Sequence, residues 1–106
     1  MAIVEVSIVP IGTRSASLSQ YVARALDVLE EAGDLKYQLT PMGTVIEGDL
    51  DRIIAVVVKM HRSAFTEDCV RVLTTVKIDE RRDKPQSMAA KVESVRRHRS
   101  GCTRPA

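Results

Sequence analysis

The segment AIVEVSIV, residues 2–9, decides the fold of this 106-residue chain. Every second residue, beginning with Ala2, is apolar and the alternate positions are mixed, which is the pattern of a strand with one buried face. Pro10 and Gly12 are expected to end this strand. Near the other end of the chain, VRVLTTVKI, residues 70–78, alternates in the same way. We expect these two segments to be the paired central strands of one sheet.

Between these strands, apolar residues recur at helical spacing in two places. Residues 17–32 predict a first helix, with Ser15 or Ser17 available as the N-cap and Gly33 as the C-terminal stop. Residues 50–61 predict a second helix. The helices therefore alternate with the strands along the chain.

A short hairpin is expected between the helices. Residues 36–40 and 44–47 alternate like strands, and Thr40-Pro41-Met42-Gly43 carries proline and glycine where a type I turn favours them. Asp49 follows the hairpin directly and is placed to cap the second helix.

The resulting order, β-α-β-β-α-β, predicts an α+β, ferredoxin-like sandwich. It has a four-stranded antiparallel sheet with both helices on one face, because right-handed crossovers place them there. A further C-terminal helix is expected over residues 87–97. We expect one domain over residues 1–98, followed by a basic, flexible tail over residues 99–106.

The face of the sheet opposite the helices is predicted to be half polar and half apolar. It is expected to carry Glu5, Ser7, Gln38, Thr40, Arg71, Thr75 and Lys77 among Ile3, Val9 and Leu73. Such a face suggests a second sheet packed against it, in a homodimer or a larger assembly that also uses the C-terminal helix. The alternative is a mixed face that stays in contact with water, as in many antiparallel sheets.

Composition argues against several classes of protein. The net charge of +2 is small, and the expected central strands hold no aromatic residue on which bases could stack, so we expect no nucleic-acid partner. No segment is long and apolar enough to cross a membrane, and the N-terminus does not resemble a signal peptide. Cys69 and Cys102 lack metal-ligand spacing and are expected to be free thiols in a reducing, cytoplasmic compartment.

The sequence shows no catalytic constellation, so we expect no enzyme. His61 lies on the apolar stripe of the second helix without an evident partner, and a structural role is the simpler interpretation. The mixed run Asp79–Lys84 is interpreted as a solvated surface of paired charges. The alternative is that Asp79 and Arg82 pair across subunits.

The hairpin segment Tyr37–Gly48 allows a binding hypothesis. Its Met and Tyr side chains can sandwich a flat heterocycle, its Thr hydroxyls can bond ring nitrogens, and Glu47 can neutralise a cation. The alternative, a sheet-edge hairpin with its Met in the core, is left open by the residues alone.

The chain resembles the small thiamine-binding protein family, long catalogued as uncharacterised proteins and related to thiamine- and hydroxymethylpyrimidine-binding domains. The matching stretches are Val4–Pro10, Tyr37–Gly48 with its TPMGTVIEG run, Arg71-Val72, Lys77–Lys84 and Lys91–Val95. The resemblance implies a ferredoxin-like fold, dimers that pair into tetramers, and thiamine or its pyrimidine bound near subunit contacts, with no established catalysis. One departure is Glu67-Asp68-Cys69, where a glycine-bearing turn is expected.

By position, the resemblance implies a ligand pocket and no other cofactor. The implied pocket residues are Ser7, Ser17, Tyr21, Thr40, Met42, Thr44 and Glu47. The expected function is non-catalytic binding of a small cationic heterocycle, thiamine or its pyrimidine moiety, at or near a subunit interface. The alternative is a purely structural or regulatory homo-oligomer without a small-molecule ligand.

Overall fold

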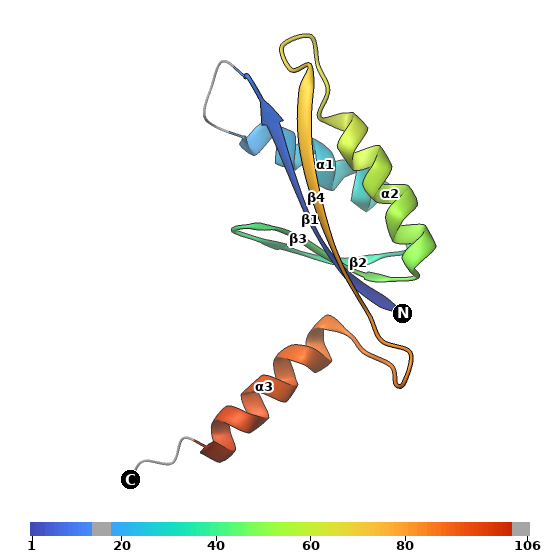
Figure 1. The fold of residues 1–106 in the computed structure, drawn as a ribbon, viewed down its shortest axis with the longest axis vertical. Coiled ribbons are helices and arrows are strands. Elements are labelled where there is room, and N and C mark those ends of the chain that lie inside the picture. Colours follow the sequence, from blue (N-terminus) through green and yellow to red (C-terminus); the bar gives the residue numbers. More distant parts are fainter. Residues whose placement is uncertain (14–17, 103–106) are drawn as a thin grey trace.

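A computed structural model describes residues 1–13 and 18–102, and its elements follow the expected order (Figure 1). The elements are β1 (Ala2–Ile11), α1 (Ser19–Ala32), β2 (Lys36–Thr40), β3 (Gly43–Gly48), α2 (Leu50–Ser63), β4 (Arg71–Glu80) and α3 (Met88–Cys102). The four strands form one antiparallel sheet in the order β2-β3-β1-β4, and α1 and α2 pack on one of its faces. The predicted α+β sandwich is confirmed.

The predicted place of residues 70–78 in the sheet is wrong. The central strands are β1 and β3, whereas β4 is an edge strand beside β1. The crossover through α2 carries the chain from β3 past β1 to the far side of the sheet. Val70 precedes β4 and is 83% exposed, so the strand begins at Arg71. The central strands still contain no aromatic residue.

Pro10 does not end the first strand, which continues to Ile11. The pairing of β1 with β3 stops at Val6, whereas the pairing with β4 continues through Pro10 to Ile11. Beyond Val6, β3 no longer pairs with β1, so that side of β1 is an unpaired edge. A proline there has no backbone N–H to donate, but no hydrogen bond with a neighbouring strand is lost. Proline is therefore tolerated inside this strand.

The core lies between the sheet and the two helices. Alternate residues of β1 and β3 meet residues of α1 and α2 there; the fully buried members include Val4, Val6, Leu29, Ile46, Ile53, Val56 and Met60. Burying a side chain of this size contributes about 1.5–3 kcal/mol. Aliphatic packing therefore supports the fold, as the scarcity of aromatic residues requires.

The helix ends follow the predicted signals where the structure describes them. Gly33, at φ 73°, ends α1 in the left-handed conformation, and Asp49 caps α2 by accepting a hydrogen bond from Arg52 N–H at 3.1 Å. Leu18 occupies the N-cap position of α1 without a side-chain cap. The predicted cap residues Ser15 and Ser17 lie outside the described residues.

The turn before β4 forms without glycine. Thr66 and Cys69 exchange two backbone hydrogen bonds of 3.1 Å, which leaves Glu67 and Asp68 at the tip, and none of the described non-glycine residues has a positive φ. Cys69 is completely buried as a free thiol. The departure from the family pattern at Glu67-Asp68-Cys69 therefore leaves a tight turn in place.

The strand register places the predicted mixed residues together on the face opposite α1 and α2. We call this the open face. Val9 is 37% exposed on it and Leu73 is 57% exposed. The helix α3 meets the open face only at its start and then projects away from the sheet (Figure 1). It continues to Cys102, beyond the predicted end at residue 97. Within residues 1–13 and 18–102, no helix has the length and apolarity that crossing a membrane requires.

Candidate ligand-binding site

A cavity of about 260 Å³ lies between α1, β1 and the tip of the β2–β3 hairpin. Among the residues that line it are Ser7, Tyr21, Thr40, Met42 and Thr44, all of which belong to the predicted pocket. The volume is slightly below the range of about 300–1,000 Å³ usual for drug-sized ligands. The cavity therefore suits one ring system better than an extended molecule.

Two hydroxyl-bearing residues of the cavity, Tyr21 and Thr44, are nearly buried and can bond to a ligand. Tyr21 and Thr44 are 7% and 6% exposed, and the structure shows neither hydroxyl bonded to another described residue. Thr40 differs, because its hydroxyl donates to the carbonyl of Gly43 at 2.9 Å and accepts from Met42 N–H at 3.3 Å. Thr40 therefore fixes the hairpin turn, whereas Tyr21 and Thr44 offer free hydrogen-bonding capacity.

The turn of the hairpin lies very close to β1. A Cβ atom built on Gly43 would be 2.8 Å from the carbonyl oxygen of Val6, so only glycine fits without a shift. This contact lies where the pairing of β1 with β3 ends. Ser7 and Ile8 continue beyond it along the cavity wall. The cavity therefore lies where residues of β3 would pair with Ser7 and Ile8 if that strand extended beyond Gly43.

No described residue that lines the cavity carries a formal charge. Outside the lining, the guanidinium carbon of Arg24 lies 5.2 Å from the ring centroid of Tyr21, a cation–π contact. A cation buried in this cavity would lose its hydration without gaining a carboxylate partner, which is unfavourable. The arrangement favours a neutral heterocycle that hydrogen-bonds to hydroxyl groups.

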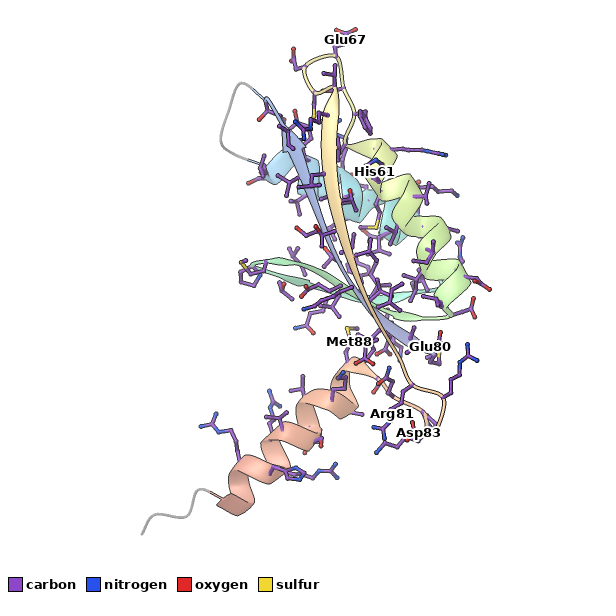
Figure 2. All side chains as sticks on the ribbon, viewed as in Figure 1. His61, Glu67, Glu80, Arg81, Asp83 and Met88 are labelled. Atoms are coloured by element: carbon purple, nitrogen blue, oxygen red, sulfur yellow. The ribbon has the colours of Figure 1, made fainter. Side chains whose placement is uncertain are left out.

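Glu47 lies apart from this cavity. Its side chain is on the open face, opposite Ile3, whereas Thr44 faces the helices. Glu47 is 7% exposed, and its Oε2 accepts a hydrogen bond from Met88 N–H, at the start of α3, at 2.7 Å. Figure 2 shows Met88 at the end of α3 that is nearest the sheet. The structure thus does not bring Glu47 together with the cavity residues, and Ser17 lies outside the described residues.

Several residues of the cavity were not among the predicted site residues. They are mainly apolar: Leu18 and Val22 come from the region of α1, Leu39 from β2 and Met60 from α2. Leu18, Tyr21, Val22 and Ala25 share the apolar stripe from which α1 was predicted, so the signal for one wall was present. The contribution of Met60 required knowing how α2 packs against α1.

His61 has a partner that the sequence did not reveal. Its Nδ1 lies 2.6 Å from Thr74 Oγ1 on β4, and its ring meets Phe65 edge to face at a centroid distance of 5.4 Å. The bond to Thr74 joins α2 to β4, and the contact with Phe65 joins α2 to the loop that follows it. Figure 2 shows the position of His61 on α2. No group of three or more metal-ligating side chains occurs within residues 1–13 and 18–102.

The charged run after β4 pairs within the chain. Asp79 binds Lys91 of α3, Arg82 binds Glu80 at 2.9 Å, and Arg81 binds Asp83 through two hydrogen bonds of 2.6 and 2.8 Å. The guanidinium of Arg81 lowers the pKa of Asp83 to about 2, and Lys91 lowers the pKa of Asp79. The predicted solvated, paired surface is present, and Asp79 does not pair with Arg82 in this chain.

Comparison with known proteins assigns the family. Residues 4–96 match the sequence model of the family described as "Thiamine-binding protein". The chain belongs to the thiamine-binding protein family. The cavity, the hairpin and the first turns of α3 all lie within the matched residues.

Relatives described as UPF0045 proteins match the chain over most of their length. The UPF0045 protein YqgV of Bacillus subtilis is 46% identical over 92% of this chain and 97% of its own. A UPF0045 protein of Methanothermobacter thermautotrophicus is 40% identical over 91% of this chain and 97% of its own. Relatives of this chain therefore occur in both Bacillus subtilis and Methanothermobacter thermautotrophicus.

Solved structures share the fold. The hypothetical protein MJ1052 of Methanocaldococcus jannaschii superposes with a TM-score of 0.81, at 39% identity over 89% of this chain and 94% of that one. A Thermotoga maritima protein, TM0486, superposes with a TM-score of 0.73, at 21% identity over 89% of this chain and 97% of that one. Both likenesses agree with the sandwich described above.

Proposed function

We propose that the protein binds thiamine, or the pyrimidine fragment of thiamine, without catalysing a reaction. The observation that carries the proposal is the uncharged cavity, in which the hydroxyls of Tyr21 and Thr44 have no bond to another described residue. Membership in the thiamine-binding family supports a small-molecule ligand, and TM0486 is described as a candidate thiamine biosynthesis or salvage protein.

The charge distribution suggests how such a ligand is oriented. The neutral aminopyrimidine ring enters the cavity, where it packs against Tyr21 and Met42 and hydrogen-bonds to Thr44. The cationic thiazolium ring stays at the mouth of the cavity in contact with water, because no carboxylate lines the interior. The proposal therefore gives Glu47 no direct contact with the ligand.

Isothermal titration calorimetry with thiamine and with hydroxymethylpyrimidine tests the proposal. Wild-type protein is expected to bind both in a saturable manner, and Thr44→Val to weaken both, by roughly tenfold if one hydrogen bond of about 1.4 kcal/mol is lost. Glu30→Gln, on the exposed side of α1, is the control and is expected to bind like the wild type. A flat titration of the wild-type protein with both compounds would refute the proposal.

A second candidate function is that of a purely structural or regulatory homo-oligomer. It is favoured by the apolar residues on the open face, since Val9 and Leu73 are 37% and 57% exposed in the monomer. We propose that this face and α3 form contacts between copies, as dimers or tetramers. Light scattering that shows an assembly, together with no stabilisation by thiamine in a thermal-shift measurement, would select this function. The free thiol of Cys69 supports a cytoplasmic location for either function.

A further inference from the structure

One hairpin connects the cavity with α3. Thr44 lines the cavity from the helix-covered face, and Thr40 and Met42 line it from the tip of the hairpin. On the open face, Glu47 holds the first amide of α3. Thr44 and Glu47 belong to the same strand, β3, and their side chains lie on opposite faces of the sheet. A ligand that shifts or restrains β3 therefore acts on both surfaces.

The helix α3 is attached to the rest of the chain near its start. Besides the bond from Met88 to Glu47, Gln86 Nε2 donates to the carbonyl of Asp79 at 3.0 Å, and Lys91 pairs with the Asp79 carboxylate. Farther along the helix, Val92 and Val95 are 48% and 61% exposed. We call the contacts of Gln86, Met88 and Lys91 the latch.

The segment before α3 allows the helix to move as a unit. Residues 81–87 between β4 and α3 form neither helix nor strand, and residues 81–85 are exposed. Just before α3, Ser87 Oγ accepts from Ala90 N–H at 3.0 Å, so the helix keeps one cap of its own when Glu47 is absent. Release of the latch thus leaves both β4 and α3 folded.

We propose that ligand binding in the cavity is coupled to docking of α3 through β3. The occupied cavity restrains the hairpin and holds Glu47 beneath Met88, so the ligand favours the docked helix. Because such coupling is reciprocal, the docked helix raises the affinity of the cavity for the ligand by the same factor. This inference rests on the proposed function and adds its regulation, in which α3 is the element that reports occupancy.

The decisive variant breaks two of the three latch contacts, those of Gln86 and Lys91, without touching the cavity or the hairpin. The double substitution Gln86→Ala/Lys91→Ala removes both contacts with Asp79 on β4. We expect thiamine affinity, measured by calorimetry, to fall by about fivefold or more. In wild-type protein, thiamine is expected to slow hydrogen–deuterium exchange of the amides in the first turn of α3. Arg97→Ala, an exposed position on the same helix, is the control and is expected to keep wild-type affinity.

Each outcome separates the two proposals. If the double variant loses protection in α3 but binds thiamine with wild-type affinity, the coupling is refuted and the ligand-binding function stands. If exchange in α3 does not change in the double variant, or if thiamine leaves it unchanged in the wild type, the coupling is also refuted. If the wild-type protein binds neither thiamine nor hydroxymethylpyrimidine, the proposed function fails and the coupling fails with it. Light scattering on each variant verifies that the comparison is made at one assembly state.

Discussion

The carboxylate of Glu47 on β3 accepts a hydrogen bond of 2.7 Å from the backbone N–H of Met88, a residue 41 positions later in the chain. The first amides of a helix have no partner within the helix, and the positive end of the helix dipole lies there. A carboxylate at this position satisfies one such amide and meets the dipole with negative charge. Glu47 therefore caps the start of α3 from the neighbouring strand β3.

Replacing Glu47 by alanine is expected to loosen α3 and to lower the free energy of unfolding by about 1 kcal/mol, the usual value of a helix cap. Glu47→Gln keeps an oxygen acceptor and is expected to cost less. Urea denaturation measures both values, and exchange of the amides in the first turn of α3 localises the effect. Equal stability of the wild-type and alanine proteins would show that the cap contributes nothing.

Gly43→Ala and Gly48→Ala form a matched pair with different expected costs. The two glycines have similar φ values of 158° and 155°, but a Cβ at Gly43 meets the backbone oxygen of Val6 at 2.8 Å, whereas one at Gly48 meets the terminal Cδ2 of Leu35 at 2.6 Å. A side chain can rotate away and a paired strand cannot. We therefore expect Gly43→Ala to destabilise by about 1–3 kcal/mol and Gly48→Ala by less, as measured by thermal and urea unfolding. The reverse order would contradict the close approach of the hairpin to β1.

The contact between His61 and Thr74 is expected to stabilise the packing of α2 on β4. A double-mutant cycle with His61→Ala, Thr74→Ala and the combined protein isolates the pairwise term. The expected coupling is about 0.5–1.5 kcal/mol, the net value of one hydrogen bond. Additive effects of the two substitutions would mean that the 2.6 Å contact makes no net contribution.

Arg81 is expected to control the titration of Asp83. In the folded protein the pKa of Asp83 is lowered to about 2 by its bonds with Arg81, while the ordinary value of an aspartate is about 3.9. A carboxylate whose pKa is lowered by folding stabilises the fold above pH 4, and this contribution disappears as the pH falls toward 2. NMR titration of the side-chain carbonyl of Asp83 is expected to show a rise toward the ordinary value in Arg81→Ala. An unchanged pKa in that variant would refute the pairing.

Most of the fold could be predicted because local patterns determine it. The alternation of residues 2–9, the apolar stripes of α1 and α2, and the stop at Gly33 each depend on residues close together in the sequence. The position of β4 at the sheet edge was predicted wrongly, because alternation shows that a segment is a strand but does not show which strands lie beside it. The effect of Pro10 was predicted wrongly for a related reason. A proline is tolerated at this position of β1 because β3 stops pairing with β1 at Val6.

The site could be predicted only in part. The hairpin residues Thr40, Met42 and Thr44 were singled out by their chemistry, and the structure places them around one cavity. The separation of Glu47 from them was not foreseen, although strand alternation places positions 44 and 47 on opposite faces. Its partner, Met88, lies in a helix whose position depends on the whole sheet, so no local pattern indicates that contact.

The free edge of β4 has a consequence for the newly made chain. The outer edge of β4 has no partner strand in the sheet that the structure describes, and its Val76 and Ile78 are 38% and 50% exposed. Such an edge is a template for aggregation, since it can pair with another extended chain. Lys77 and Asp79 alternate with these two residues along the strand, and charges in such positions act as gatekeepers against stacking into fibres. The same alternation that forms the open face thus protects the newly made chain from misassembly.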